Sequence, residues 1–357
     1  MKRILFFLSA IFLATPPLLV ADPLRVGVIQ STSGIAAEDG KTVVQALQLA
    51  NKHLGEKIEL LIEDDQTSAK NAVSSYNALK ARGAEVIIGA TWDFTTNALI
   101  PLAARDKIVL FNTSTLPEAI SLNESDGFAF TNAVSTYEEA APFSRFIRAK
   151  TNQSIVTVYA NNSWGETQRK VYQKIAKDAG LKILGEYSSV AFDQNEWRNV
   201  LPTIKSKNPS FVLLLLNKND LQIFLKRASE LSFTPEIFAS KNALDAFSAT
   251  DNKSLYHGLC FTYPFEQLQR NNDFLSAYYQ SFEEKPRIYA DNSYDALFIL
   301  SRAQEIADLR DISLREALQD VEIVGLVGSY RYSNEHSFSL GRASLMCVDK
   351  DEAKLIK

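Results

Sequence analysis

Short apolar runs alternate with amphipathic segments along the first third of the chain. Each run is rich in valine, isoleucine or leucine and stops at a glycine or a polar turn. The segments between the runs repeat apolar residues every three or four positions, as at Val43, Leu47 and Ala50, which is typical of a helix lying on a sheet. Strands are predicted at residues 24–29, 58–62, 86–88 and 108–111, and helices at 40–54, 68–82 and around 99–103. This alternation predicts a parallel sheet covered by helices on both faces.

A second series of the same kind follows. It also alternates apolar runs with amphipathic segments, so the chain is predicted to form a second sheet of similar size. Strands are predicted at 155–159, 183–187, 211–216, 237–239, 258–262, 329–332 and 343–348, and helices at 137–150, 166–179, 197–204, 221–231, 272–283 and 292–307. Two such sheets with a crevice between them predict a two-lobed α/β clamshell.

Two polar turns follow strands of the first sheet. Residues 90–96 follow the strand that ends at Gly89, and residues 112–115 follow the strand that ends at Phe111. Both turns fall at the carboxyl ends of parallel strands, outside which ligands bind in open α/β sheets. Hydroxyl-rich turns also cap helices without binding anything, and this alternative stays open for any single serine or threonine. Two such turns one crossover apart favour a binding site.

The N-terminal residues have the order of a secretory signal. Lys2 and Arg3 precede the apolar stretch 4–14, and cleavage is predicted after Ala21. The apolar stretch has 11 residues, against the roughly 20 that cross a bilayer. A cleaved signal peptide at residues 1–21 and export from the cytoplasm are therefore expected, with a retained membrane anchor as the alternative.

Composition and charge argue against several partners. Cleavage would remove 21 of the 357 residues and two positive charges, which leaves 336 residues and changes the formal net charge from −4 to −6. An acidic chain without basic blocks is not expected to bind nucleic acid or anionic membrane surfaces. A mature chain of this length is long enough for two domains with a core each.

No motif for catalysis, for a cofactor or for a metal is found. Residues 34–42 are similar to a phosphate-binding loop, but five residues separate the two glycines instead of four. Glu38 and Asp39 would also repel a phosphate. No partner spacing for hydrolysis accompanies the three histidines, which are His53, His257 and His336. The chain is therefore predicted not to be an enzyme and to use no cofactor or metal.

Two cysteines, Cys260 and Cys347, remain in a compartment that is expected to be oxidising. Each lies in an apolar, strand-like run, and neither has a metal-ligand spacing. They can form a disulfide if their strands are neighbours, and buried free thiols are the alternative.

Several short motifs follow one another over nearly all of the predicted mature chain. They are the strand and Ser33-Gly34 turn within 26–40, Glu63-Asp64-Asp65 before a helix, Gly83 before 86–89, the segment 108–117, Trp164-Gly165, the helix start at 292–296, and the segment 325–332. In this order and spacing they resemble the type I periplasmic solute-binding proteins of the branched-chain amino-acid (Leu/Ile/Val)-binding family. Members of that family capture substrates for ABC importers.

The resemblance implies two Rossmann-like parallel-sheet lobes joined by a hinge with three crossings, near residues 134–136, 262–264 and 341–343. Lobe 1 is expected to comprise residues 22–134 and 264–342, and lobe 2 residues 135–263 and 343–357. Both cysteines then fall in lobe 2 close to the hinge. The expected partners are a separate inner-membrane permease and its ATPase, and the protein itself is expected to be a monomer.

The ligand-contacting positions of the family can be carried over one by one. The family often has a hydroxyl residue for the ligand carboxylate where this chain has Asp93, and an acid for the ligand amino group where it has Lys241. The usual charges are thus exchanged, and the two residues either pair across the closed cleft or are solvated on its lips. The other predicted ligand-binding residues are Trp92, Thr113, Ser114, Thr115, Trp164, Asn217 and, at the mouth, Asp39. Both tryptophans lie in polar turns, where a large ring is seldom needed as filler, although core packing is the alternative.

Three functions remain open from the sequence. The leading one is capture of a small polar solute, such as an amino acid or a related compound, for an ABC importer. The alternatives are a periplasmic sensor or regulatory module that signals to a membrane receptor or an envelope enzyme, and a periplasmic hydrolase. Because the charge exchange disfavours ordinary leucine-like amino acids, the expected ligand is a reversed zwitterion, an amide, a polyol or an aromatic compound.

Overall fold

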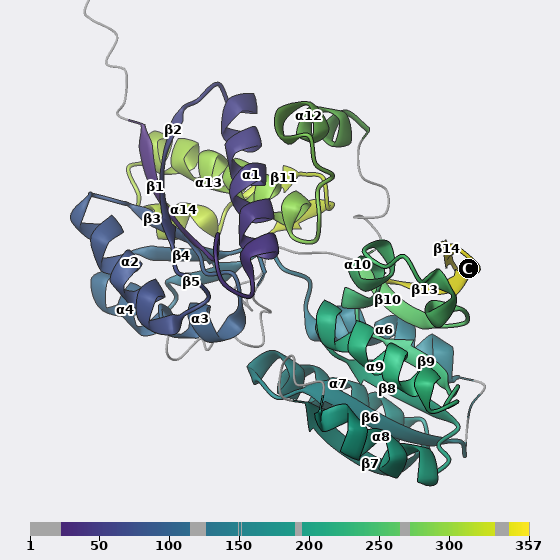
Figure 1. Cartoon of the computed structure of the whole chain (residues 1–357). Helices are drawn as coiled ribbons and strands as arrows, with labels where there is room; N and C mark the ends of the chain where they lie inside the picture. Colours follow the sequence, from purple (N-terminus) through teal and green to yellow (C-terminus); the bar gives the residue numbers. More distant parts are fainter. Residues whose placement is uncertain are drawn as a thin grey trace, which may run out of the picture.

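Two sheet-centred lobes make up the fold (Figure 1). The computed structural model describes residues 23–114, 126–148, 150, 152–189, 195–264, 272–332 and 343–356. Within this range the predicted two-lobed α/β clamshell is confirmed. The predicted signal peptide, residues 1–21, lies outside the described residues. None of the helices described here has both the length and the apolar character that crossing a bilayer requires.

Lobe 1 is built on a five-stranded parallel sheet. Its elements are β1 (Leu24–Gln30), α1 (Ala37–His53), β2 (Ile58–Asp64), α2 (Ala69–Ala81), β3 (Val86–Gly89), α3 (Asp93–Asn97), α4 (Ile100–Asp106), β4 (Val109–Asn112), β5 (Ala129–Thr131), α12 (Asn272–Phe282), α13 (Ala290–Arg310), α14 (Leu314–Leu318) and the hairpin strands β11 (Glu322–Val324) and β12 (Ser329–Arg331). The strand order is β2-β1-β3-β4-β5. Val86 and Ile88 pack with α1 and α13 on one face, whereas Ile87 packs with α2 and α4 on the other. Because both faces are covered, this strand is apolar at every position before Gly89.

Lobe 2 repeats this arrangement around a seven-stranded sheet. Its elements are α6 (Thr136–Ile147), β6 (Ser154–Ala160), α7 (Ser163–Asp178), β7 (Lys182–Ser189), α8 (Glu196–Ser206), β8 (Phe211–Leu215), α9 (Lys218–Glu230), β9 (Glu236–Ala239), α10 (Asn242–Ser248), the 3₁₀ helix η2 (Lys253–Tyr256), β10 (Cys260–Pro264), β13 (Ala343–Asp349) and β14 (Glu352–Leu355). The strand order is β14-β13-β10-β9-β8-β6-β7, and only the pairs that involve β13 are antiparallel. Val212 packs with α8 and α9, and Leu213 packs with α6 and α7.

The chain passes between the lobes three times, after β5, after β10 and after β12. Next to the first crossing, the side-chain amide of Asn132 donates to the backbone oxygen of Asn292 and receives the reciprocal bond at its own backbone oxygen, both at 2.7 Å. Residues 265–271 and 333–342 of the other two crossings lie outside the described residues. The residue boundaries expected for the two lobes therefore stay a prediction.

Some local elements differ from the sequence prediction. The crossover helix expected around 99–103 is two short helices, α3 and α4, and Pro101 lies in the first turn of α4. Proline is favoured there because that position has no intrahelical use for an N–H group. The short helix α10 and the edge strand β14 were not predicted. The sequence of β14, EAKL, has no apolar run that would mark a strand.

Candidate functional site

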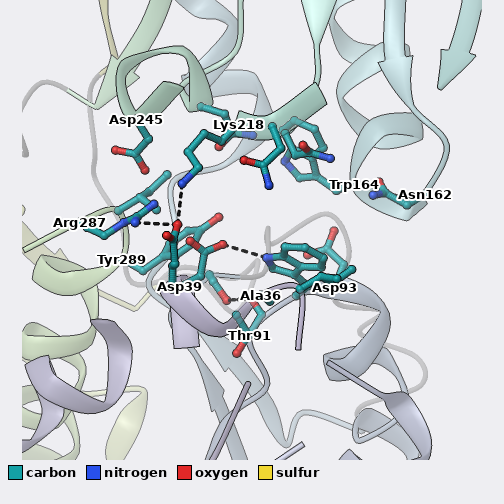
Figure 2. Close-up of a pocket in the computed structure, with 18 of the residues that line it drawn as sticks. Ala36, Asp39, Thr91, Asp93, Asn162, Trp164, Lys218, Asp245, Arg287 and Tyr289 are labelled. Carbon is teal, nitrogen blue, oxygen red and sulfur yellow. Dashed lines mark hydrogen bonds and ion pairs between the residues drawn. The ribbon is translucent and has the colours of Figure 1, made fainter. Parts of the chain in front are cut away.

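A cavity of about 130 Å³ lies between the two lobes (Figure 2). Lobe 1 contributes the start of α1, the β3–α3 turn, Ser114 after β4 and residues 287–289 before α13. Lobe 2 contributes the N-terminal ends of α7 and α9 and two residues of α10. All of these segments except 287–289 follow the carboxyl end of a strand. The cavity thus lies where the two polar turns of the sequence place a ligand site.

Six of the nine predicted ligand-binding residues line this cavity. They are Asp39, Trp92, Asp93, Ser114, Trp164 and Asn217. Ser114 is held in its turn, because its hydroxyl donates to the backbone oxygen of Thr91 at 2.6 Å. Thr113 and Lys241 are buried but are not part of the wall, and the Thr113 hydroxyl lies 2.9 Å from that of Ser293 on α13. Thr115 lies outside the described residues.

Lys241 lies beneath the wall in a buried ion pair. Its Nζ is 3.2 Å from Oε2 of Glu139, a residue of α6 in the same lobe, and the two side chains are 7% and 0% exposed. The same Nζ lies 5.8 Å from the centre of the Tyr289 ring, which forms part of the wall. The positive charge that the sequence places at the cleft is therefore paired with Glu139 inside lobe 2, not with Asp93 across the cleft.

Trp92 and Asp39 contact each other on the lobe 1 side of the cavity (Figure 2). The indole Nε1 of Trp92 donates to Oδ2 of Asp39 at 3.1 Å. The Phe94 ring packs against the indole edge to face, with 6.2 Å between the ring centres. Burial raises the pKa of the Asp39 carboxyl, and the hydrogen bond from Trp92 opposes that shift. The indole is thus held in place on the wall by one polar and one aromatic contact.

Asn162 and Asn217 cap α7 and α9, two of the lobe 2 helices that begin at the cavity. The side-chain oxygen of Asn162 accepts from the Gly165 N–H at 2.8 Å, and that of Asn217 accepts from the Asp220 N–H at 2.9 Å. The Asn217 amide also donates to the Asp220 carboxylate at 2.7 Å. These caps satisfy backbone donors and fix the first turns of α7 and α9. They thereby position Trp164, in the first turn of α7, on the cavity wall.

Glu38 joins the two lobes at the cavity (Figure 2). Its Oε2 accepts from Lys218 of lobe 2 at 2.5 Å and from Arg287 of lobe 1 at 2.7 Å. The hydrogen bond from Lys218 lowers the pKa of Glu38, although partial burial opposes the shift. Sequence reasoning considered Glu38 only as an acid that would repel phosphate, and it missed both bases. Their positions, 180 and 249 residues from Glu38, give no local spacing that could have revealed the cluster.

Tyr289 was also missed, although it lies close to carboxylates of both lobes. Burial raises the pKa of its phenol well above the usual value, and the charges of Asp39, Asp93, Glu139 and Asp245 raise it further. Its backbone is left-handed, with φ 74° and ψ −8°, at the residue before α13. The sequence signal was an aromatic residue three residues before the long helix predicted at 292–307.

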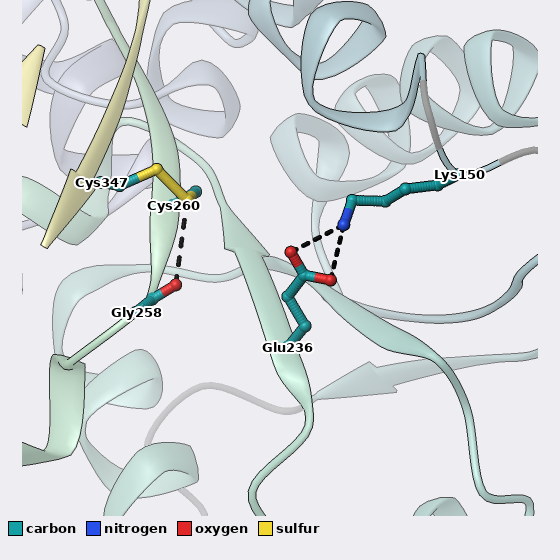
Figure 3. Close-up of a disulfide and its surroundings, with 5 residues drawn as sticks. All are labelled: Lys150, Glu236, Gly258, Cys260 and Cys347. Atoms are coloured by element: carbon teal, nitrogen blue, oxygen red, sulfur yellow. Dashed lines mark hydrogen bonds and ion pairs between the residues drawn. A yellow bond between two sulfur atoms is a disulfide. The ribbon is translucent and has the colours of Figure 1, made fainter. Parts of the chain in front are cut away.

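Cys260 and Cys347 form a disulfide within lobe 2 (Figure 3). They are directly opposite residues of the antiparallel pair β10 and β13. Of the two alternatives left open by the sequence, the structure therefore has the disulfide. The described part of the chain also holds no group of three or more His, Cys, Asp or Glu side chains arranged to bind a metal ion.

The chain is similar to known proteins over nearly all of its length. A family model described as "Periplasmic binding protein" matches residues 23–352. The structure is similar to a leucine binding protein, LivK, from Thermotoga maritima, with a TM-score of 0.81 and 18% identity over 94% of this chain and 98% of that one. It is similar to the branched-chain amino acid transporter substrate binding protein LivJ from Streptococcus pneumoniae in complex with isoleucine, with a TM-score of 0.78 and 16% identity over 94% and 99%. It is also similar to an ABC transporter solute binding protein from R. palustris in complex with benzoate, with a TM-score of 0.80 and 16% identity over 94% and 95%.

Proposed function

Because the chain belongs to the periplasmic binding protein family, we propose that it captures a small polar solute between its lobes for an ABC importer. The observation that carries this proposal is the cavity, whose wall comes from both lobes. A ligand there touches both lobes at once, so its binding free energy favours the closed arrangement over the open one. Two of the similar proteins are in complex with isoleucine and with benzoate, which supports a ligand of about that size.

The proposal also assigns a location and partners. The mature chain acts in the periplasm, and the closed form presents both lobes to an inner-membrane permease that works with an ATPase. The family supports this assignment, since its members are periplasmic binding proteins. Deleting the gene should abolish uptake of the compound that the purified protein binds. Unchanged uptake together with a loss of ligand-induced gene expression would favour the sensor function instead.

A thermal-shift screen of amino acids, amines, amides, polyols and aromatic acids tests ligand capture. A compound present at a hundred times its dissociation constant should stabilise the folded protein by about 2.7 kcal/mol. Small-angle scattering with such a compound should show a smaller radius of gyration than without it. If no compound stabilises the protein and no change in shape is seen, the proposed function is wrong.

Two alanine variants test whether a compound found in the screen binds in the cavity. Trp164→Ala removes a ring from the cavity wall and should weaken binding of any hit. Tyr279→Ala removes a ring on α12 that is 57% exposed and is not part of the cavity wall. Equal binding by both variants would show that the hit binds elsewhere.

A further inference from the structure

Acidic side chains outnumber basic ones in the described wall of the cavity. The acids are Glu38, Asp39, Asp93 and Asp245, and the bases are Lys218 and Arg287. Both bases contact the same acid, Glu38, with nitrogen–oxygen distances of 2.5 and 2.7 Å. Four acids against two bases leave the described part of the wall with a formal excess of negative charge. An anionic ligand would have to compete with Glu38 for both bases.

The other three acids come from both lobes and act on the same region of the cavity. Asp39 belongs to α1 and Asp93 to α3 of lobe 1, whereas Asp245 belongs to α10 of lobe 2. The charges of all three raise the pKa of the buried Tyr289 phenol, so their fields overlap at one part of the wall. The pKa of Asp39 itself is raised by burial and, to a smaller extent, by Asp245. A positive charge placed there would therefore be stabilised by carboxylates of both lobes.

Aromatic rings surround the same space. Trp92, Phe94, Trp164 and Tyr289 all line the cavity, and the two tryptophans come from different lobes. Ring faces attract ammonium and guanidinium groups, tryptophan most strongly, and they also cover apolar carbon atoms. Rings and acids together are thus suited to a cation that carries an apolar body.

The size of the cavity limits that body. Its volume is about 130 Å³, close to the roughly 150 Å³ of an engineered protein cavity that binds benzene. A ligand whose body has about the heavy atoms of one ring therefore fits.

We propose that the solute is a small organic cation, an amine or a guanidine on an aliphatic or aromatic body about the size of one ring. This inference rests on the proposed function, because it concerns the ligand class of the same interlobe site. It replaces the reversed zwitterion expected from the sequence, since the Lys241 ammonium meant to hold the ligand carboxylate is paired with Glu139 outside the wall.

Matched probes test the charge of the ligand. Benzylamine, benzyl alcohol and benzoate share one ring and differ in charge at pH 7, and 1,4-diaminobutane and 1,4-butanediol form an aliphatic pair. Calorimetric titration of the mature protein should give an affinity for each amine at least about tenfold above that of its uncharged partner. Benzoate should bind more weakly than benzylamine.

Two variants, one in each lobe, test the acids. Asp39→Asn keeps an oxygen that can accept the Trp92 indole N–H, and Asp245→Asn removes a charge from the opposite lobe. Each should lower the affinity for the amines by about tenfold and change the affinity for the alcohols little. Asp178→Asn, on the exposed surface of α7 with a side chain 65% exposed, is the control and should bind as the wild type does. Two separate variants keep the test valid if one of them fails to fold.

The outcomes separate the ligand class from the function. If benzoate, leucine or an alcohol binds and closes the lobes while no amine does, the cation inference is wrong and solute capture stands. Amine binding that is unchanged in both aspartate variants also overturns the inference. If no compound of any class in the wider screen binds, both the inference and the proposed function fail.

Discussion

Replacing Lys241 with methionine should destabilise lobe 2 much more than replacing Lys218 with methionine. Each lysine pairs with one glutamate, and the partly exposed pair is the closer one, with 2.5 Å between Lys218 and Glu38 against 3.2 Å between Lys241 and Glu139. Burial reverses that order, because the side chains of the second pair are 7% and 0% exposed. Among the described residues, neither carboxylate oxygen of Glu139 has a hydrogen-bond partner. Lys241 therefore provides the main compensation for a buried negative charge.

The expected magnitudes follow from that difference in burial. Removing one partner of a buried ion pair costs about 3–5 kcal/mol, because the other charge stays buried and uncompensated. Removing one partner of an exposed pair costs about 0–1 kcal/mol. The double variant Lys241→Met/Glu139→Gln should recover much of the loss, because a neutral amide is far less costly to bury than a carboxylate.

Urea unfolding at pH 7 measures these free energies. Trp197 is a suitable fluorescence reporter, since it is 1% exposed in the core of lobe 2 and packs edge to face against Phe224. In a Trp92→Phe/Trp164→Phe background its signal follows lobe 2 even if the two lobes unfold separately. A Lys241→Met cost below about 1 kcal/mol, or one no larger than that of Lys218→Met, would refute the buried-charge reasoning.

Replacing both Cys260 and Cys347 with serine should lower the free energy of unfolding by up to about 4.6 kcal/mol, the loop-entropy value for a separation of 87 residues. If reducing the disulfide of the wild type leaves its urea unfolding unchanged, this prediction is wrong. Glu38→Gln should weaken the contact with Lys218 across the cleft and shift the ligand-free protein about twofold to fivefold toward open forms. Fluorescence energy transfer between labels on the two lobes measures that shift, and an unchanged distribution would argue against it. Burial raises the pKa of Asp295 to about 7, whereas the same carboxyl in the unfolded chain titrates near 4. Between these two pH values the folded state therefore binds a proton that the unfolded state has lost. The stability of the protein should fall as pH rises from about 4 to 7. Asp295→Asn should remove this contribution to the pH dependence of the unfolding free energy, as measured by urea unfolding. An unchanged pH dependence would contradict the prediction.

Much of the fold is predictable because buried parallel strands leave a strong local signal. Val86, Ile87 and Ile88 are all apolar since helices cover both faces of their sheet, and a run of this kind needs no distant information. The disulfide lacks such a signal. Cys260 and Cys347 meet because β10 and β13 pair antiparallel in one register, and that register depends on a chain that leaves lobe 2 and returns to it.

The candidate site is only partly predictable for a related reason. Position along the chain places residues near the ends of strands, but not the direction of each side chain. Thr113 and Ser114 are adjacent in one turn, yet only Ser114 lines the cavity, while Thr113 contacts α13. Lys241 likewise lies at the end of a strand and contacts Glu139, a residue on a different helix. The sequence indicates the charge at such a position but not which neighbour neutralises it.

The charges of the cavity also explain how a ligand would control closure. Closing an empty cleft brings Asp245 of lobe 2 toward Asp39 and Asp93 of lobe 1, and carboxylates that approach one another repel. The contact between Glu38 and Lys218 opposes this repulsion, but it is partly solvated and worth less than about 1 kcal/mol. A cation of the proposed ligand class between the lobes attracts the carboxylates of both. The charges that repel one another in the empty cleft then favour closure. A neutral compound in the cavity leaves the repulsion in place, so it should favour the closed form less than an amine of equal size does.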